Sequence, residues 1–317
     1  MNEKAAIQHK TKNMKKILFL ILFGLTLTTR LFCQENGFIE TDNGVIHYIK
    51  FGSGEPLLII NGGPGLDCEG FIPLAKLLSD KYMTILFDQR GTGKSELGKI
   101  DSTAVTMELM VKDIETIRNY LNIDEWIVLG HSFGGWMAEY YAAYYPDHIK
   151  AMILSSSGGI DMSILGYFNA NLQIRLSQTE RDSLTYWDNR VKQGDTTKLA
   201  KYNWGKYLAS AYLYDKKYVP ALAERLSFGG NAQITGLVYK DLFKIGLDFK
   251  ETLKNFIQPV LIIQGRQDIT GDGVAYEAHM TLKNSSIVFI NKSGHYSWWE
   301  QSEQYKSEVE KFIASVD

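Results

Sequence analysis

A five-residue motif in the middle of the chain, Gly130-His131-Ser132-Phe133-Gly134, has the G-x-S-x-G pattern. It follows the apolar run Ile127–Leu129 and precedes a segment with helical periodicity. A sharp turn from a strand into a helix exposes the serine hydroxyl there, and the small glycines let the flanking chains pass. Such a turn is strained by about 1–3 kcal/mol and persists mainly where function requires it. The motif therefore predicts that Ser132 is the nucleophile of an acyl-transfer reaction.

The serine hydroxyl needs two partners before it can react. An imidazole must take its proton, and a carboxylate must hold that imidazole in the correct tautomer. With this motif the expected order along the chain is serine, acid, histidine, with each partner in a loop after a late strand. Asp268 follows the apolar run at 260–263 and His295 follows the run at 287–290, so we predict that they complete the triad. Asp272 is the competing acid, and we expect His131 to pack rather than to act as the base.

Two backbone N–H groups are expected to stabilise the oxyanion that forms during acyl transfer. One is the amide of Phe133, directly after the nucleophile, and the other comes from the loop after an early strand. Here that loop is Asn61-Gly62-Gly63-Pro64-Gly65, in which the glycines allow the chain to turn its N–H groups inward. Gly63 is the predicted donor, with Gly62 as the alternative.

A glycine-rich segment at 91–95 resembles the end of a phosphate-binding loop, but its spacing is wrong. That loop requires a glycine five residues before Gly93, and Asp88 stands there. The six histidines and two cysteines show no close pairing of the kind that holds a metal ion. The net charge of −2, without a clustered basic face, argues against nucleic acid as a partner. The sequence therefore predicts no metal and no cofactor, and a small molecule or short peptide as the substrate.

The elements that must position these residues follow an alternating pattern. Two segments around the turn at 42–44 predict an antiparallel hairpin. After it, short apolar runs typical of strands buried on both faces alternate with segments of helical periodicity. The runs are Leu57–Ile60, Met83–Phe87, Trp126–Leu129, Ala151–Leu154, Val260–Ile263 and Ile287–Ile290, and the helical segments are Ile72–Leu78, Met107–Leu121, Trp136–Tyr144 and Glu303–Ala314. This pattern predicts an α/β fold with a mostly parallel sheet and helices on both faces.

The alternation stops between about residues 160 and 249, where helix-like segments rich in tyrosine and tryptophan replace the strand-like runs. We interpret this region as a helical cap inserted into the sheet. The predicted organisation is a core formed by 34–156 and 253–317, with a cap insertion formed by 157–252. Most aromatic residues of the cap are expected to pack its own helices, and others to line an apolar substrate pocket.

The first 33 residues have the pattern of an export signal. Lys15 and Lys16 precede the apolar run Ile17–Leu27, which is too short to span a bilayer comfortably. We therefore predict a signal peptide at 1–33 and a periplasmic or secreted mature protein without a stable membrane span. An uncleaved N-terminal anchor is the alternative. The sequence does not predict an oligomeric state.

Taken together, Asn61–Gly65, Asp88–Ser95, the serine motif and Gly265–Asp268 resemble the proline iminopeptidase family of α/β-hydrolases. The resemblance spans the whole predicted core. It implies the α/β-hydrolase fold, the triad already derived, and release of N-terminal residues from short peptides. Asp88 and Arg90 are expected to form a structural pair beneath the active site.

The resemblance also implies that acidic side chains of the cap bind the free α-ammonium group of the peptide. Glu180, Asp182 and Glu224 are available in the predicted cap, and we assign this role to Glu180 and Glu224. The family usually has His at the start of the first glycine loop, where this chain has Asn61. Hydrolysis of a carboxylic ester or lactone therefore stays open as an alternative. A non-catalytic binding protein on the same fold is a more remote one.

Overall fold

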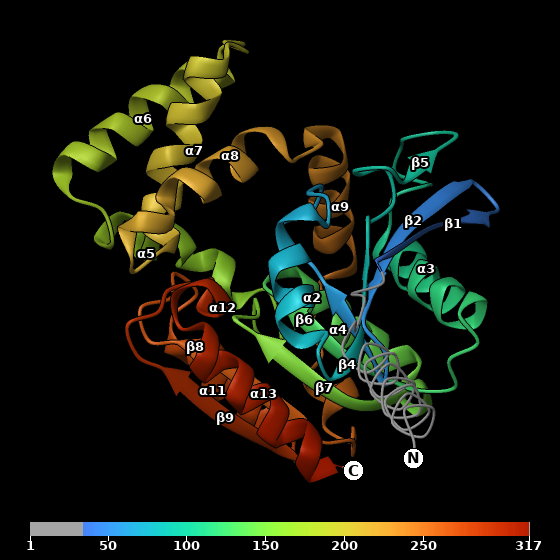
Figure 1. The fold of residues 1–317 in the computed structure, drawn as a ribbon. Coiled ribbons are helices and arrows are strands. Elements are labelled where there is room, and N and C mark those ends of the chain that lie inside the picture. The colour runs from blue at the N-terminus through green and yellow to red at the C-terminus, as the bar shows by residue number, and fades with distance from the viewer. Residues whose placement is uncertain (1–33, 317) are drawn as a thin grey trace, which may run out of the picture. The chain divides into compact units, whose positions relative to one another are not determined.

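A nine-stranded sheet forms the centre of the structure, a computed structural model that describes residues 34–316. The predicted signal peptide at 1–33 lies outside the described residues. The strands are β1 (Glu35–Thr41), β2 (Gly44–Phe51), β3 (Glu55–Ile60), β4 (Tyr82–Phe87), β5 (Glu96–Leu97), β6 (Trp126–His131), β7 (Ile149–Ser155), β8 (Val260–Gly265) and β9 (Ser285–Ile290). Their order is β1-β2-β4-β3-β6-β7-β8-β9, with β5 against β2 (Figure 1).

The pairing of the strands confirms the predicted α/β fold. β1 and β2 form the expected antiparallel hairpin, with Glu40 opposite Val45. β2 pairs antiparallel with β4 and with β5. The strands β4, β3, β6, β7, β8 and β9 are all parallel to one another. Each apolar run in the sequence lies in one of these strands. The predicted mostly parallel sheet is therefore correct.

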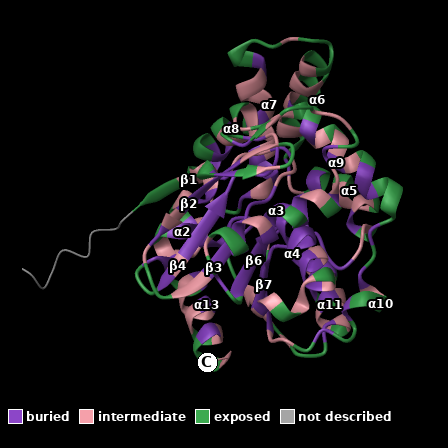
Figure 2. Cartoon of the chain, turned by 90° about the vertical axis from the view of Figure 1, so that its right-hand side faces the viewer, coloured by how far each residue is buried: buried purple, intermediate pink, exposed green. Residues whose placement is uncertain are grey.

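Helices cover both faces of the sheet, because successive strand residues point to opposite sides. Leu58 and Ile60 point to the side of the sheet whose buried cluster includes residues of α3 (Met107–Tyr120), α4 (Phe133–Tyr144) and α11 (Asp272–Thr281). Leu57 and Ile59 pack on the other side with α2 (Ile72–Leu78) and α13 (Ser302–Val316). In Figure 2 the strands β3, β4, β6 and β7 are accordingly drawn largely as buried. The helix predicted at Trp136–Tyr144 begins earlier, at Phe133, directly after the serine of the motif.

The segment 157–252, between β7 and β8, folds almost entirely into helices. They are α5 (Phe168–Ile174), α6 (Gln178–Lys192), α7 (Lys198–Tyr212), α8 (Val219–Phe228), α9 (Ala232–Ile245) and the start of α10 (Lys250–Leu253). Within this segment α7 packs against α6 and α8. None of the helices in residues 34–316 combines the length and the hydropathy that a membrane span requires.

Helix α4 carries a buried carboxyl group without a hydrogen-bond partner among the described residues. Glu139 is 0% exposed, and both of its side-chain oxygens are unpaired. Burial, with repulsion from Asp161, raises the pKa of the Glu139 carboxyl well above its usual value of 4.5. A buried unpaired charge is costly, so the group stays protonated.

The stability of the Glu139→Gln variant relative to the wild type should increase as the pH rises. Above about pH 4.3 the unfolded chain releases the Glu139 proton, whereas the raised pKa lets the folded wild type retain it, so the stability of the wild type falls relative to the variant as the pH rises. The free energy of unfolding in urea, measured between about pH 5 and pH 8, should show this divergence. Parallel pH profiles for the two proteins would contradict it.

Candidate active site

Ser132 occupies a strained turn between β6 and α4. Its backbone has φ 55° and ψ −119°, in a region that residues with a side chain rarely adopt. A Cβ at Gly130 would lie 2.3 Å from the Gly134 carbonyl, and one at Gly134 would lie 2.2 Å from the Ile60 carbonyl. Both positions touch backbone, so neither has room for a side chain. The glycines of the motif therefore let α4 pack directly against β3.

Neighbouring backbone holds the turn in place. The Ser132 N–H donates to the Ser155 carbonyl at 3.1 Å, at the end of the adjacent strand β7. The Ser132 carbonyl accepts from Gly135 at 2.9 Å and from Gly158 at 3.2 Å. These bonds offset the strain of the positive φ.

His295 and Asp268 form a buried hydrogen-bonded pair. Nδ1 of His295 lies 2.8 Å from Oδ1 of Asp268, although 27 residues separate them in the sequence. Burial raises the pKa of the Asp268 carboxyl, but the His295 ring and the N–H of Thr270 more than offset this, and the net pKa is lowered. Asp268 is therefore ionised and able to orient the imidazole.

The competing acid, Asp272, has a different partner. Its carboxylate pairs with Arg266 at 2.7 Å, and both side chains are more than one third exposed. The structure thus brings Asp268, and not Asp272, to His295.

His131 packs beside this pair. Its ring centroid lies 4.6 Å from that of His295, and its Nδ1 lies 3.0 Å from the Ser155 carbonyl. Burial, and then the nearby His295, lowers the pKa of His131 well below 6.5. The ring is therefore neutral, in agreement with the packing role that the sequence predicts.

The predicted oxyanion loop lies against Ser132. A Cβ at Gly62 would be 2.8 Å from Cβ of Ser132, and Gly63 has a φ of +78°. Gly63 and Phe133 both line the same cavity as Ser132. Phe133 is the first residue of α4, where helix N–H groups have no partner within the helix. Both predicted donors are thus next to Ser132, and their role in catalysis stays a prediction.

The expected pair between Asp88 and Arg90 does not form, and that prediction was wrong. Asp88 accepts hydrogen bonds from His47 Nδ1 and from the Cys68 N–H, both at 2.8 Å. Arg90 donates to Asp113 on α3, with Nε 2.8 Å from Oδ2. Asp88 and Arg90 each bind a partner on another element, and the two sets of contacts fix the position of the segment after β4.

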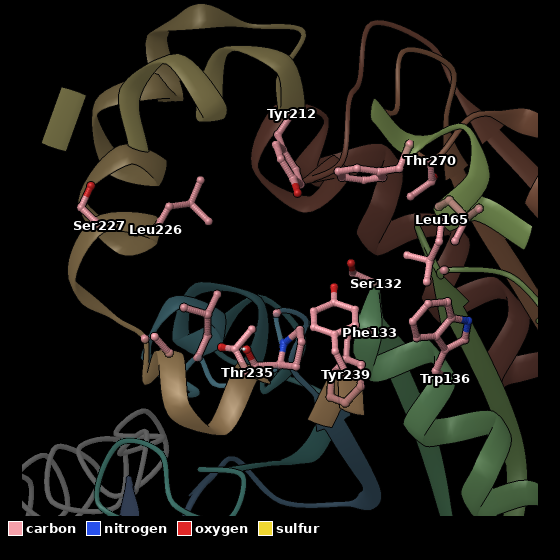
Figure 3. Close-up of a pocket in the computed structure, with 18 of the residues that line it drawn as sticks. Ser132, Phe133, Trp136, Leu165, Tyr212, Leu226, Ser227, Thr235, Tyr239 and Thr270 are labelled. Atoms are coloured by element: carbon pink, nitrogen blue, oxygen red, sulfur yellow. Dashed lines mark hydrogen bonds between the residues drawn. The ribbon is translucent and has the colours of Figure 1, made fainter. Parts of the chain in front are cut away.

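A cavity of about 590 Å³ opens above Ser132 and extends between the core and the helical segment. Its aromatic lining residues are Phe133, Trp136, Phe168, Trp204, Tyr212 and Tyr239. Figure 3 shows Tyr212 and Tyr239 pointing into the space that the Ser132 hydroxyl faces. Among the described residues that line the cavity, Lys201 is the only basic one, and none is acidic.

Comparison with known proteins agrees with this architecture. The pattern that defines the family described as "alpha/beta hydrolase fold" matches residues 55–302. This chain belongs to the α/β hydrolase fold family. It is therefore a hydrolase, and its fold and its enzymatic nature agree with the sequence prediction.

Individual proteins resemble this chain at low sequence identity. A proline iminopeptidase of Heyndrickxia coagulans is 28% identical, over 88% of this chain and 99% of the relative. An α/β fold family hydrolase from Bacillus anthracis has a similar structure, with a TM-score of 0.73 and 19% identity over 90% of this chain and 99% of the other. An esterase from Exiguobacterium antarcticum has a TM-score of 0.66 and 20% identity, over 89% and 99%. At this level of identity, the two structures demonstrate a shared fold.

The two acidic residues assigned to ammonium binding lie away from the cavity lining of this hydrolase. The Glu180 carboxylate caps α6, where it accepts the N–H of Ser177 at 2.8 Å. Glu224 is exposed on α8. Neither lines the cavity. Their assignment stays a prediction that rests on the family resemblance alone.

Other lining residues were not singled out by the sequence. Trp136 lies one turn into α4 after Ser132, so its spacing from the motif was an available signal. Tyr239 and Thr235 lie on α9, more than 100 residues after the motif. Only the return of α9 to the glycine loop, where the Thr235 hydroxyl donates to the Pro64 carbonyl at 2.7 Å, brings them to the site.

The substitution Asp268→Asn should lower kcat by about 10³–10⁴-fold, because the amide no longer holds His295 in the required tautomer. Asp272→Asn is the matched control, since it removes an exposed ion pair at the same loop and should leave kcat nearly unchanged. Steady-state rates of the two purified variants check this. A larger loss for Asp272→Asn would reassign the acid.

Proposed function

We propose that this hydrolase works through an acyl-enzyme formed on Ser132. The observation that carries the proposal is the convergence of three loops at the carboxyl ends of β6, β8 and β9, where Ser132 stands in a strained turn and His295 is paired with Asp268. Parallel strands present their carboxyl ends at one edge, so residues distant in the sequence meet there.

The chemistry follows from the roles of these groups. His295 takes the proton of the Ser132 hydroxyl as its oxygen attacks the substrate carbonyl, and then gives that proton to the leaving group. Water, activated by the same imidazole, cleaves the acyl-enzyme and releases the acid. The N–H groups of Gly63 and Phe133 stabilise the oxyanion in both steps, each by about 2.7–4 kcal/mol.

The proposed substrate is the N-terminal residue of a short peptide, as in an aminopeptidase of the proline iminopeptidase type. Support comes from the relative of that name, which this chain covers almost completely. The cavity also suits a small acyl group, since aromatic side chains supply a large apolar surface. The segment 157–252 acts as a cap that closes the cavity over the bound peptide.

Hydrolysis of a carboxylic ester or lactone is the second candidate. One observation favours it: the described residues that line the cavity include no carboxylate to pair with a free ammonium group. An uncharged acyl group needs no counter-ion. Both candidates use the same acyl-enzyme chemistry, so they differ in the leaving group and not in the triad.

We also propose that the protein is exported. Support comes from the basic and apolar pattern of residues 15–27. The described part of the chain contains one free cysteine, Cys68, which is buried in the core. Fractionation of cells that express the full chain should find activity outside the cytoplasm; activity confined to the cytoplasm would contradict export.

Ser132→Ala should abolish labelling by a fluorophosphonate probe and lower kcat by about 10⁵–10⁶-fold. The reason is that alanine has no hydroxyl to acylate. Wild type and variant are compared by mass spectrometry of the labelled protein and by rates on a proline anilide and a short-chain ester. Equal labelling of both proteins would move the nucleophile elsewhere, and an unlabelled wild type would favour the non-catalytic alternative.

The same measurement discriminates the two substrate classes. We expect a higher kcat/KM on the proline anilide than on the ester. A wild type that labels at Ser132 but hydrolyses the ester alone would establish the second candidate.

A further inference from the structure

Glu300 joins two segments that lie far apart in the sequence. It ends the short helix α12 (Ser297–Glu300), and its carboxylate accepts two backbone N–H groups. Oε1 accepts from Asp215 at 2.6 Å, and Oε2 accepts from Gly294 at 2.6 Å. Gly294 directly precedes His295, whereas Asp215 follows α7 in the segment 157–252. One side chain therefore links the loop of the catalytic base to the helical segment.

Direct contacts between the same two segments reinforce this link. The His295 N–H donates to the Tyr212 carbonyl at 2.7 Å. The Tyr212 ring meets the imidazole edge-on, with centroids 5.1 Å apart. A Cβ at Gly294 would lie 2.3 Å from the Tyr212 carbonyl, so the two backbones are in contact. Because Tyr212 also lines the cavity (Figure 3), the end of α7 is at once a cavity wall and a support for His295.

A carboxylate suits the position of Glu300 better than any other side chain of its size. Its two oxygens accept hydrogen bonds from separate donors, and charge-assisted bonds of this kind are short and strong. Burial raises the pKa of the Glu300 carboxyl, and the backbone N–H groups of Asp215, Gly294 and Tyr214 offset part of this rise. Glutamine has one carbonyl oxygen, so its NH₂ group would face the second N–H donor. Glu300→Gln thus breaks one of the two contacts without changing the volume.

We propose that Glu300 is a positioning residue for His295. It holds the loop of the base against the end of α7, so that the orientation of the imidazole depends on the position of the helical segment 157–252. The inference rests on the proposed function, because it requires His295 to act as the base. Glu300 is absent from the described lining of the cavity, so its effect falls on turnover and not on substrate affinity.

The test compares Glu300→Gln with Glu303→Gln, an exposed glutamate at the start of α13. Glu300→Gln should lower kcat by about 10- to 100-fold, the cost of misplacing a reacting group by about 1 Å. KM should change by less than about twofold, and the control should match the wild type in both. The deshielded proton NMR signal of His295 Nδ1–H should shift or broaden in Glu300→Gln alone. An unchanged kcat with an unchanged signal would overturn the proposal.

A second pair of variants changes the donor of the hydrogen bond between the Asp215 N–H and Glu300, so the proposal can be tested even if Glu300→Gln folds poorly. Asp215→Pro removes the N–H donor, at a φ of −90° that lies close to the range of proline. Asp215→Ala removes the same side chain and retains the N–H. We expect the loss of kcat in Asp215→Pro and not in Asp215→Ala. In a Glu300→Ala background, where both contacts are already lost, Asp215→Pro should add little further loss of kcat; full additivity would contradict the proposal.

The outcomes separate this inference from the proposed function. If the wild type is not labelled at Ser132, the acyl-enzyme proposal fails whatever Glu300 does. If the wild type is labelled and the Glu300 and Asp215 variants keep the wild-type kcat, the positioning role fails and the acyl-enzyme stands. Thermal unfolding of each variant identifies any loss of kcat that comes from unfolded protein.

Discussion

The close approach of α4 to β3 is the constraint on which the site depends. Gly130 and Gly134 leave no space between the helix and the neighbouring backbone, so the chain must turn sharply at Ser132 and accept a positive φ. Hydrogen bonds of the Ser132 backbone to Ser155, Gly135 and Gly158 offset the strain of this turn. A serine held this way stands at the carboxyl end of β6 and cannot relax into an ordinary helix start.

The parallel sheet places the other residues of the site at the same edge as Ser132. Because β6, β8 and β9 run in the same direction, the segments after them emerge at the same edge, and Asp268 meets His295 across 27 residues of sequence. β6 and β8 are buried along their whole length, with helices packed on both faces of the sheet, whereas β9 at the edge is only partly buried. The pairing of the strands sets the distance between the loops they carry.

The helical segment 157–252 is more than a cover for the cavity. On one side it holds the glycine loop, through the Thr235 hydroxyl on Pro64 and the Asn231 N–H on the Gly65 carbonyl. On the other side it holds the loop of His295, through Tyr212 and the carboxylate of Glu300. The wall of the cavity and the support of the His295 loop are therefore built from the same helices.

The amino-acid sequence by itself determined the fold class, the strands and the identity of the motif residues, because these depend on periodicity and on short spacing that a single segment carries. It also placed Asp268 ahead of Asp272 from the position of each after a strand. The partners of Asp88 and Arg90, the contact between Glu300 and Asp215, and the position of Tyr239 at the cavity were decided only by the tertiary structure. Each of these joins elements that are distant in the sequence, and a side chain chooses among such partners by proximity in the folded chain, which no local pattern encodes.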